Sequence, residues 1–412
     1  MSTTRKTPKL RFPEFTGDWE QRELGEIAEK VTKKNSNLEI SETFTNSAEQ
    51  GIISQKDFFD HKVASSENIG NYYVVDKNDF VYNPRISTTA PVGPINRNRL
   101  GRAGVMSPLY TVFRAKDINQ LFLEWYFKSS CWHLFMYFNG DSGARSDRFS
   151  IKDSVFFSMP IFVPSKEEQF KIGRFFDQLN ETITLHQREL DSLKKLKKSL
   201  LQKMFPKNGE KIPELRFPEF TGDWEQRKLS DISERVTRKN KNLEYSLPLT
   251  ISAQYGLVDQ HEFFNKRIAA KDVSGYYVIK NGEFAYNKSY SEGYPWGAVK
   301  RLDRYKNGVL STLYILFSVK NVNSDFLVSY YDTNNWHSEV QQRSAEGARN
   351  HGLLNISASD FFDTALVIPQ DPNEQKKIGL LFKKLDSTIT LHQRELDTLK
   401  KLKKGLLQNM FV

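Results

Sequence analysis

Residues 182–205 read TITLHQRELDSLKKLKKSLLQKMF, and residues 388–411 read TITLHQRELDTLKKLKKGLLQNMF. The two stretches share 21 of 24 residues at an offset of 206. Self-similarity of this length indicates a tandem duplication, in which each copy covers about half of the chain. In both stretches apolar residues recur at alternating steps of three and four, a pattern that predicts a long amphipathic helix in each half.

The apolar stripe of each predicted helix has the spacing of a coiled-coil seam. We expect its apolar members to form the packing surface: Leu179, Ile183, Leu190, Leu193, Leu200, Leu385, Ile389, Leu396, Leu399 and Leu406. The favoured hypothesis is that the two helices pair as an antiparallel coiled coil, because two stripes of equal pattern would otherwise each need a separate partner. The alternative is that each helix packs only on the globular part of its own half. A helix of about 35 residues is roughly 50 Å long, on the order of 15 base pairs of B-DNA, so the pair is expected to act as a spacer.

The beginning of each half is also repeated. Residues 10–24 read LRFPEFTGDWEQREL and residues 215–229 read LRFPEFTGDWEQRKL, which is 14 identities in 15. Between the repeated ends, residues 85–103 and 289–307 share only four of 19 positions. Each half is therefore expected to have the same scaffold and a divergent surface.

Strand-like and helix-like runs alternate between these ends. Strands are predicted at 74–82 and 278–286, and helices at 121–135 and 326–340. We predict an α/β (α+β) fold with two mixed α/β domains, separated by a pair of long antiparallel coiled-coil helices and related by a pseudo-two-fold internal duplication.

The repeat also predicts the domain boundaries. The first domain, with its N-terminal repeat segment, is expected at 1–163 and the first spacer helix at 164–206. The second domain is expected at 207–369 and the second spacer helix at 370–412.

Charge is divided equally between the two halves. The chain has 412 residues and a net charge of +10, and each half carries 30 basic and 25 acidic residues. Two equally basic halves suit a ligand that is long, regular and negative, such as double-stranded DNA. The single cysteine, Cys131, excludes an internal disulfide framework, and neither a bilayer-length apolar run nor a signal sequence is present. We therefore expect a cytoplasmic protein with no membrane partner.

The sequence carries no convincing catalytic motif. It has no G-x-x-x-x-G-K-[ST] phosphate loop and no G-x-G-x-x-G turn after a strand. Asn83-Pro84-Arg85 begins like the Asn-Pro-Pro-aromatic loop of amino-methyltransferases, but Arg85 replaces the second proline. The seven histidines form no close pair with an acid or a cysteine at ligand spacing, so no zinc site is predicted. A non-catalytic binding protein is favoured; the alternatives are a self-contained DNA methyltransferase or nuclease, and a non-specific nucleic-acid-binding coiled-coil scaffold.

Three basic and polar stretches recur in both halves and are candidates for DNA contact. Arg, Asn and Lys are the residues that read guanine and adenine edges in the major groove, and they also bind phosphates. The predicted DNA-binding residues of the first half are Lys33, Lys34, Asn35, Arg85, Arg97, Asn98, Arg99, Arg102, Arg145 and Arg148. Those of the second half are Arg238, Lys239, Asn240, Lys288, Tyr290, Trp296, Lys300, Arg301, Arg349 and Asn350. The lysine clusters at 194–198 and 400–404 are expected to form a solvated outer face of the helices.

Three features of the sequence resemble one known family. They are the repeated LRFPEFTGDWEQR segment, the Leu- and Lys-rich helices, and a P-x-x-x-E-Q-x-x-I start of the first long helix, which recurs with one additional residue in the second. The residues of this start are Pro164, Glu168, Gln169 and Ile172, and then Pro369, Glu374, Gln375 and Ile378. Over essentially all 412 residues the chain resembles the specificity (S) subunit of type I restriction–modification systems.

The resemblance implies a division of labour between subunits. Each divergent domain would be a target-recognition domain that reads one half of a bipartite, asymmetric DNA site, and the helices would set the spacer between the half-sites. The repeats would dock two modification (methyltransferase) subunits, and up to two restriction (motor-nuclease) subunits would join them. This chain would carry no catalytic residue, cofactor or metal, because S-adenosylmethionine, ATP and Mg²⁺ would be bound by the partners.

Overall fold

The chain forms two compact units in the computed structural model, and each unit is described by itself. The first unit comprises Met1–Gln187 and Arg394–Val412, and the second comprises Arg188–Gln393. The structure describes residues 6–58, 69–141, 147–207, 209–252, 255–265, 269–270, 272–290, 293–344 and 353–412.

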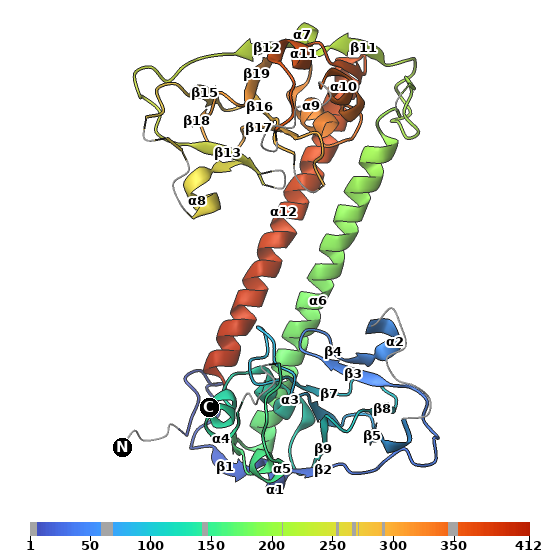
Figure 1. Ribbon diagram of the computed structural model, residues 1–412, viewed down its shortest axis with the longest axis vertical. Coiled ribbons are helices and arrows are strands. Elements are labelled where there is room, and N and C mark those ends of the chain that lie inside the picture. The colour runs from blue at the N-terminus through green and yellow to red at the C-terminus, as the bar shows by residue number, and fades with distance from the viewer. Residues whose placement is uncertain are drawn as a thin grey trace. The chain divides into compact units, whose positions relative to one another are not determined.

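The globular part of the first unit is built on an antiparallel four-stranded sheet of order β2-β9-β6-β7 (Figure 1). Three two-stranded pairs, β1-β10, β3-β4 and β5-β8, surround it. The elements are β1 (Glu20–Glu23), α1 (Leu24–Ile27), β2 (Ala28–Lys30), β3 (Phe44–Ser47), β4 (Gly51–Ser54), α2 (Gln55–Phe58), η1 (Ile69–Asn71), β5 (Tyr73–Val75), β6 (Phe80–Tyr82), β7 (Ile95–Arg97), β8 (Gly104–Met106), β9 (Thr111–Ala115), α3 (Gln120–Lys128), α4 (His133–Asn139), α5 (Asp153–Phe157) and β10 (Pro160–Val163).

The second unit repeats this topology. Its four-stranded sheet has the order β12-β19-β16-β17, and its pairs are β11-β20, β13-β14 and β15-β18. The elements are β11 (Glu225–Lys228), α7 (Leu229–Ile232), β12 (Ser233–Val236), β13 (Leu249–Ser252), β14 (Gly256–Asp259), α8 (Gln260–Phe264), β15 (Tyr277–Lys280), β16 (Phe284–Asn287), β17 (Ala298–Arg301), β18 (Asn307–Leu310), β19 (Ile315–Val319), α9 (Ser324–Tyr331), α10 (His337–Arg343), α11 (Ala358–Phe362) and β20 (Ala365–Ile368).

All four predicted runs are interrupted in the structure: 278–286 divides into β15 and β16, and 326–340 divides into α9 and α10, as their counterparts in the first half do. The strand predicted at 74–82 is two strands, because Asn78 adopts a left-handed φ of 71° and turns the chain between β5 and β6. The helix predicted at 121–135 is divided into α3 and α4, because the Ser129 hydroxyl donates a hydrogen bond to the Tyr126 carbonyl oxygen at 2.6 Å and ends α3. Local polar side chains thus override the apolar periodicity at both places.

The long helices are α6 (Lys166–Lys203) and α12 (Pro372–Asn409). The Glu168 N–H donates to the Ser165 hydroxyl at 3.3 Å, and the Asn373 N–H donates to Asp371 Oδ1 at 2.8 Å, so a polar side chain precedes and caps each helix. Among the described residues no helix combines the length and the apolar character needed to cross a membrane.

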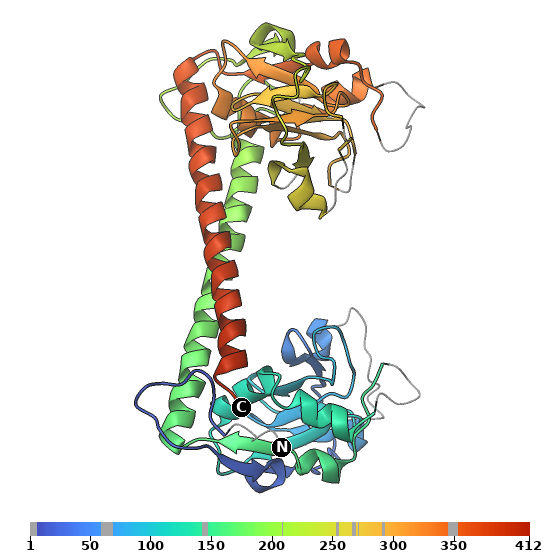
Figure 2. The ribbon, with the colours of Figure 1, turned by 90° about the vertical axis from the view of Figure 1, so that its left-hand side faces the viewer.

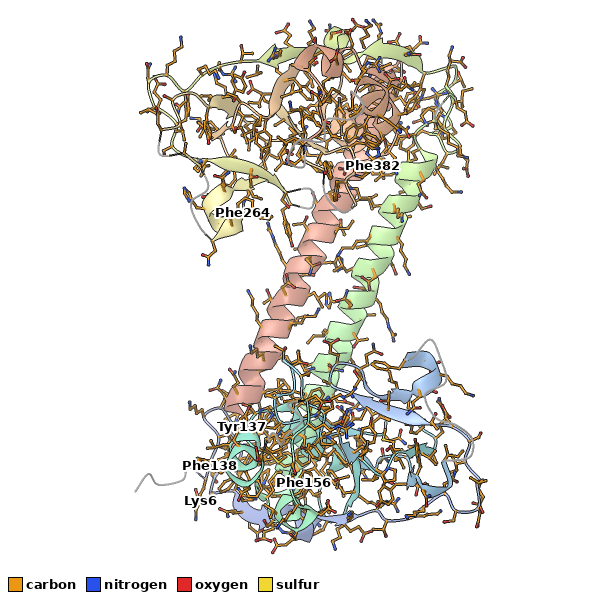
Figure 3. All side chains as sticks on the ribbon, viewed as in Figure 1. Lys6, Tyr137, Phe138, Phe156, Phe264 and Phe382 are labelled. Atoms are coloured by element: carbon orange, nitrogen blue, oxygen red, sulfur yellow. The ribbon has the colours of Figure 1, made fainter. Side chains whose placement is uncertain are left out.

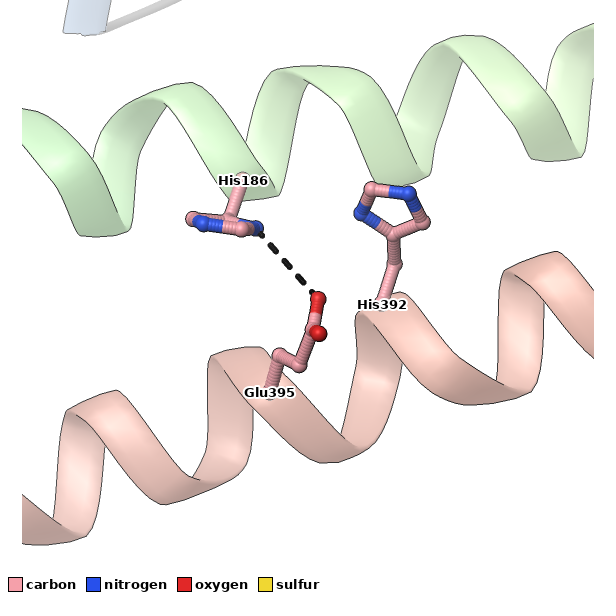
Figure 4. A group of neighbouring side chains, drawn as sticks. All are labelled: His186, His392 and Glu395. Carbon is pink, nitrogen blue, oxygen red and sulfur yellow. Dashed lines mark ion pairs between the residues drawn. The ribbon is translucent and has the colours of Figure 1, made fainter.

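In each unit a segment of α6 packs antiparallel to a segment of α12 (Figure 2). In the first unit Lys400 donates to Gln187 Oε1 at 3.1 Å and Lys403 to Asn180 Oδ1 at 2.6 Å. His186 Nδ1 lies 3.9 Å from Glu395 Oε2 in the same unit (Figure 4). None of the ten predicted packing residues is exposed, and Ile183, Leu190 and Leu396 are buried, with Leu396 wholly inaccessible.

The end of each long helix closes the core of one unit. Phe205 follows α6, and the centre of its ring lies 5.9 Å from that of Phe382 in the second unit. Both rings are buried, and Phe382 is labelled in Figure 3. Phe411, after α12, lies 5.7 Å from Phe176 in the first unit. The Leu10 N–H donates to the Asn409 carbonyl oxygen at 2.9 Å, just as the Leu215 N–H donates to the Lys203 carbonyl oxygen at 2.8 Å. The segment around Leu10 therefore packs against the end of α12 in the first unit. In the second unit the segment around Leu215 packs in the same way against the end of α6.

The predicted fold class is confirmed: each half forms a mixed α/β domain, and the two long helices pair antiparallel. The same topology in both units is what the internal duplication predicts.

Candidate nucleic-acid interface

A cavity of about 490 Å³ with both polar and apolar lining residues opens in the first unit beside the divergent loop. It lies between the β3–β4 hairpin and the segment that follows β6, and its lining combines amides, hydroxyls and two arginines. The polar lining residues are Thr45, Asn46, Ser47, Gln55, Tyr72, Asn83, Arg85, Ser87, Ser107, Tyr110 and Arg148. These groups offer both hydrogen-bond donors and acceptors, as recognition of base edges requires.

The two arginines of this cavity are held side by side by the backbone. Arg85 and Arg148 form an antiparallel bridge, and the Phe149 N–H donates to the Pro84 carbonyl oxygen at 2.7 Å. The Arg85 side chain is 67% exposed, and its nearest carboxylate oxygen, on Asp147, is 3.9 Å away. An exposed arginine and a half-buried one on the same backbone bridge, both lining the cavity, suit contact with guanine edges or phosphates.

Asn83 shapes the loop that carries Arg85. Its Oδ1 accepts a hydrogen bond from the Arg85 N–H at 3.0 Å, and its Nδ2 donates to the Asn46 carbonyl oxygen at 2.8 Å. Gly93 packs on the same residue with a φ of +83°, and a Cβ there would lie 2.1 Å from the Asn83 carbonyl oxygen. A side chain at Gly93 would therefore displace the loop.

The second unit repeats this scaffold with different side chains. Asn287 Oδ1 accepts from the Ser289 N–H at 3.0 Å, and a Cβ on Gly297 would again lie 2.1 Å from the carbonyl oxygen of Asn287. Ser289 and Leu353 form the antiparallel bridge that Arg85 and Arg148 form in the first unit. The backbone bridge is thus kept, and the residues on it change from two cations to a serine and a leucine.

Several predicted DNA-binding residues of the first unit are held by intramolecular ion pairs. The Arg97 side chain is only 10% exposed and donates to Glu124 at 2.7 Å, and Arg99 donates to the same carboxylate at 2.8 Å. Arg102 donates twice to Glu42 at 2.7 Å and lowers the pKa of that carboxyl below its usual range. These contacts assign Arg97 and Arg99 to the packing of the loop against α3.

The same holds for their counterparts in the second unit. Lys300 donates to Asp332 at 2.7 Å. Arg301 donates to Asp303 and Asp325, both at 2.7 Å, and its side chain is 11% exposed. Lys300 and Arg301 are therefore part of the domain's own framework.

Three predicted asparagines are buried and serve the backbone, so DNA contact by their side chains is not supported. Asn35 donates to the Ile40 carbonyl oxygen at 2.8 Å and accepts from the Ile40 N–H at 3.1 Å. Asn240 does the same with Tyr245, at 2.8 and 3.2 Å. Asn98 is wholly inaccessible and donates to the Arg102 carbonyl oxygen at 2.9 Å. These buried amides thus hydrogen-bond the backbone of their own loops.

The other predicted residues have mixed surroundings. Lys33, Lys34 and Tyr290 are exposed, whereas Arg148, Lys288 and Trp296 are half-buried. Arg238 is exposed and pairs with Glu283 at 2.6 Å, and Lys239 lies over the Tyr277 ring, 4.1 Å from its centre. DNA contact by these residues stays a prediction. Arg145, Arg349 and Asn350 lie outside the described residues.

The sequence reasoning missed the polar residues of the β3–β4 hairpin. Thr45 and the Tyr110 hydroxyl lie 3.4 Å apart at the cavity, and Thr250 and the Tyr314 hydroxyl lie 3.2 Å apart at the matching place in the second unit. This threonine–tyrosine pair recurs at nearly the offset of the repeat and could have been found in the sequence. Asn46 could not, because Ile251 replaces it in the second half.

The comparison with protein families agrees with this geometry. Residues 16–195 match the family described as type I restriction modification DNA specificity domain. The second half repeats the topology of the first, and its ends repeat the sequence of the first.

Solved structures with this fold belong to the same class of systems. The S subunit of a type I restriction–modification system from M. genitalium matches with a TM-score of 0.61 and 14% identity, over 98% of this chain and 99% of that one. A chain from a structural study of complex assembly and conformational transition of the type I R-M system matches with a TM-score of 0.50 and 12% identity, over 94% of this chain and 96% of that one. At these identities the matches show the fold alone. The chain is thus similar to the DNA specificity subunits of type I restriction–modification systems, in sequence over residues 16–195 and in fold over nearly its whole length.

Proposed function

We propose that each unit reads one half of a bipartite DNA target through the cavity between its first hairpin and its divergent loop. The observation that carries this proposal is the conserved backbone bridge with changed side chains, Arg85 and Arg148 in one unit and Ser289 and Leu353 in the other. Two unlike readers on one scaffold are what an asymmetric target requires, because base edges are discriminated by side-chain donors, acceptors and apolar groups.

The side chains of the two bridges favour different bases. Arginine donates two parallel hydrogen bonds to O6 and N7 of guanine, so the half-site of the first unit should contain at least one guanine that depends on Arg85 or Arg148. Serine accepts and donates a single hydrogen bond, and leucine contacts the methyl group of thymine. The half-site of the second unit should therefore depend less on guanine at the matching position.

The helices and the repeated segments would serve the assembly. We propose that α6 and α12 set the spacer between the half-sites and that the repeated surfaces dock two methyltransferase subunits, with up to two motor-nuclease subunits joining them. Two copies of one docking surface suit two identical partners. S-adenosylmethionine, ATP and Mg²⁺ would then be bound by the partners, while this chain supplies recognition.

The direct test is a change of one reader at a time. Arg85→Ala and Arg148→Ala, in the full chain purified with the subunits that accompany it, should relax base preference in one half-site by about 1–3 kcal/mol and leave the other unchanged. Ser289→Ala is the matched control at the same bridge position of the second unit. Selection from a randomised DNA library measures both half-sites at once, and a flat preference of the unaltered chain would contradict the proposal.

Exchange of residues 25–160 for another such domain is the coarser test. It should change one half-site of the methylated sequence and keep the other, because the second unit is untouched. Changes in both half-sites would show that the units do not read independently.

A further inference from the structure

A second cavity in the first unit, of about 470 Å³, is lined by four lysines. They are Lys128 at the end of α3 and Lys400, Lys403 and Lys404 on α12. The hydroxyl residues Thr89, Ser129 and Ser130 also line it, as do His133 and Gln408. Ala48 and Pro94 line both this cavity and the one that holds Arg85, so the two cavities adjoin.

The two inner lysines of this cavity have amide partners instead of acids. Lys128 Nζ donates to Asn96 Oδ1, and Lys403 Nζ donates to Asn180 Oδ1 at 2.6 Å. Among the described residues neither forms an ion pair, since the nearby Glu124 is bonded to Arg97 and Arg99. Desolvation and the positive charge of Lys128 lower the pKa of Lys403 to about 8, and desolvation also lowers the pKa of Lys128.

Lys128 is exposed to solvent although its ammonium group is crowded by protein atoms. Lys128 and Lys403 both line the cavity, so an anion that enters it would supply the countercharge that they lack.

The matching cavity in the second unit, of about 360 Å³, carries the same helix lysines, but Lys197 and Lys300 in it are paired with carboxylates. Lys197, the counterpart of Lys403, donates to Asp332 at 2.8 Å and to Asp386 at 2.6 Å. Lys300 donates to the other oxygen of Asp332 at 2.7 Å. Burial by itself lowers the pKa of Lys197, but the two carboxylates raise it by more, so the pKa of Lys197 lies above the usual value.

We propose that the lysine cavity of the first unit binds one phosphodiester group of the DNA backbone and that its counterpart in the second unit does not. The inference rests on the proposed function, because the cavity adjoins the one assigned to base recognition. Lys128 and Lys403 supply two positive charges, and the hydroxyls of Thr89, Ser129 and Ser130 supply hydrogen bonds to phosphate oxygens. In the second unit Asp332 occupies the position of Lys128 and repels an anion.

The site predicts an asymmetric salt dependence of DNA binding. We would measure the dissociation constant of the full chain, purified with its accompanying subunits, on its own target between about 50 and 200 mM salt. Loss of one phosphate contact reduces the slope of log K against log salt by about one. Lys403→Gln should show this reduction with unchanged base preference, whereas Lys197→Gln, the matched variant of the second unit, should keep the slope.

A second variant separates the site from a general effect on folding. Lys128→Asp gives the first unit the acid that the second unit has, so it should neutralise Lys403 and reduce the slope as Lys403→Gln does. Lys403→Arg keeps the charge and should keep the slope. An unchanged slope in both Lys403→Gln and Lys128→Asp, with sequence-specific binding intact, would overturn the inference and leave the proposed function standing.

A labelling experiment distinguishes DNA from a free anion. Target DNA should protect Lys403 from acylation, and inorganic phosphate at equal concentration should not. Equal protection by inorganic phosphate would overturn the assignment to the DNA backbone. Failure of the unaltered chain to prefer any sequence would instead contradict the proposed function, so the two failures are distinguishable.

Discussion

Lys197 and Lys403 occupy the same position of the repeated helix sequence but have opposite surroundings. Lys197 is enclosed by Asp332 and Asp386, whereas Lys403 lies among Lys128 and the amide of Asn180. The helix residue is identical, so the difference comes from the globular domain and from one helix position that diverged. The comparison teaches that a duplicated segment takes its electrostatic environment from the segments that pack against it.

A second contact between a domain and a long helix also has its charges reversed between the two units. In the first unit the domain presents Arg99 to Asp177 of α6, with the atoms 2.5 Å apart. In the second unit the domain presents Asp325 to Lys383 of α12, at 3.1 Å. Asp177 and Lys383 are equivalent positions of the repeat. Each domain therefore carries a charge opposite to that of its own helix segment. The same domain residue would meet a like charge on the helix segment of the other unit.

The strongest test of this comparison is removal of Asp332. Asp332→Ala leaves Lys197 and Lys300 without this shared carboxylate, and we expect it to lower the free energy of unfolding by about 3 kcal/mol. Lys128→Ala, at the equivalent position of the first unit, should be neutral or slightly stabilising because it removes a like charge beside Lys403. Guanidinium unfolding of the full chain measures both, and equal losses would show that the surroundings of the two lysines do not differ in energy.

Two glycines test what the units share. A Cβ on Gly173 would lie 2.9 Å from the Phe122 backbone nitrogen, and one on Gly379 would lie 2.5 Å from the Phe326 backbone nitrogen. Each glycine thus lets a long helix approach the backbone of α3 or α9, so Gly173→Ala and Gly379→Ala should each cost about 2 kcal/mol. Thermal unfolding should show a similar loss for both; a loss in only one unit would mean that the packing is not duplicated as closely as the sequence.

The lowered pKa of Lys403 predicts a pH dependence that Lys197 lacks. The pKa of Lys403 is about 8 in the folded chain, compared with the usual value of 10.5. Between these two pH values the lysine is protonated mainly in the unfolded chain. The free energy of unfolding therefore rises with pH in this window. Because the group is half-buried, we expect a gain of about 1–2 kcal/mol between about pH 7.5 and pH 10.

The unaltered chain should show this gain relative to Lys403→Met. Lys197→Met is the control, since the pKa of Lys197 is raised and it stays protonated in that range. Unfolding measured at several pH values checks the difference. If the unaltered chain and Lys403→Met have parallel pH profiles, the lysine has an ordinary pKa.

Reversal of the exposed charge pair should have the smallest effect. Asp177→Lys places a lysine beside Arg99, whose side chain is 41% exposed, so we expect a loss of only about 0.5–1 kcal/mol. Lys383→Asp places an acid beside Asp325 and should cost about the same. High salt should remove most of both losses, as measured by denaturant unfolding; a loss that is insensitive to salt would indicate packing rather than charge.

Much of the fold could be predicted because periodicity is a local property of the chain. The apolar stripe from Leu179 to Leu200 predicted a long helix, and the repeat predicted its partner. The division of one predicted helix at Ser129 was missed, because a single hydroxyl that bonds to a backbone carbonyl is invisible to a pattern of apolar residues.

The candidate site was predicted only in part. Arg85 and Arg148 were found by residue type, but the same reasoning also selected Arg97 and Asn98. Their roles differ because Glu124 binds the first and backbone groups bind the second, and these partners are not adjacent in sequence.

The sequence by itself determined the duplication, the two amphipathic helices and the divergent loops, since each of these is expressed in residue order and spacing. Only the tertiary structure decided which cations are paired with acids inside their own unit. The charge state and accessibility of a side chain depend on neighbours from distant positions in the sequence. Asp332 is such a neighbour of Lys197, and Lys128 is such a neighbour of Lys403. Two identical lysines in a repeated helix therefore differ in pKa because electrostatic energy depends on distance in space, and the repeat fixes only position in the chain.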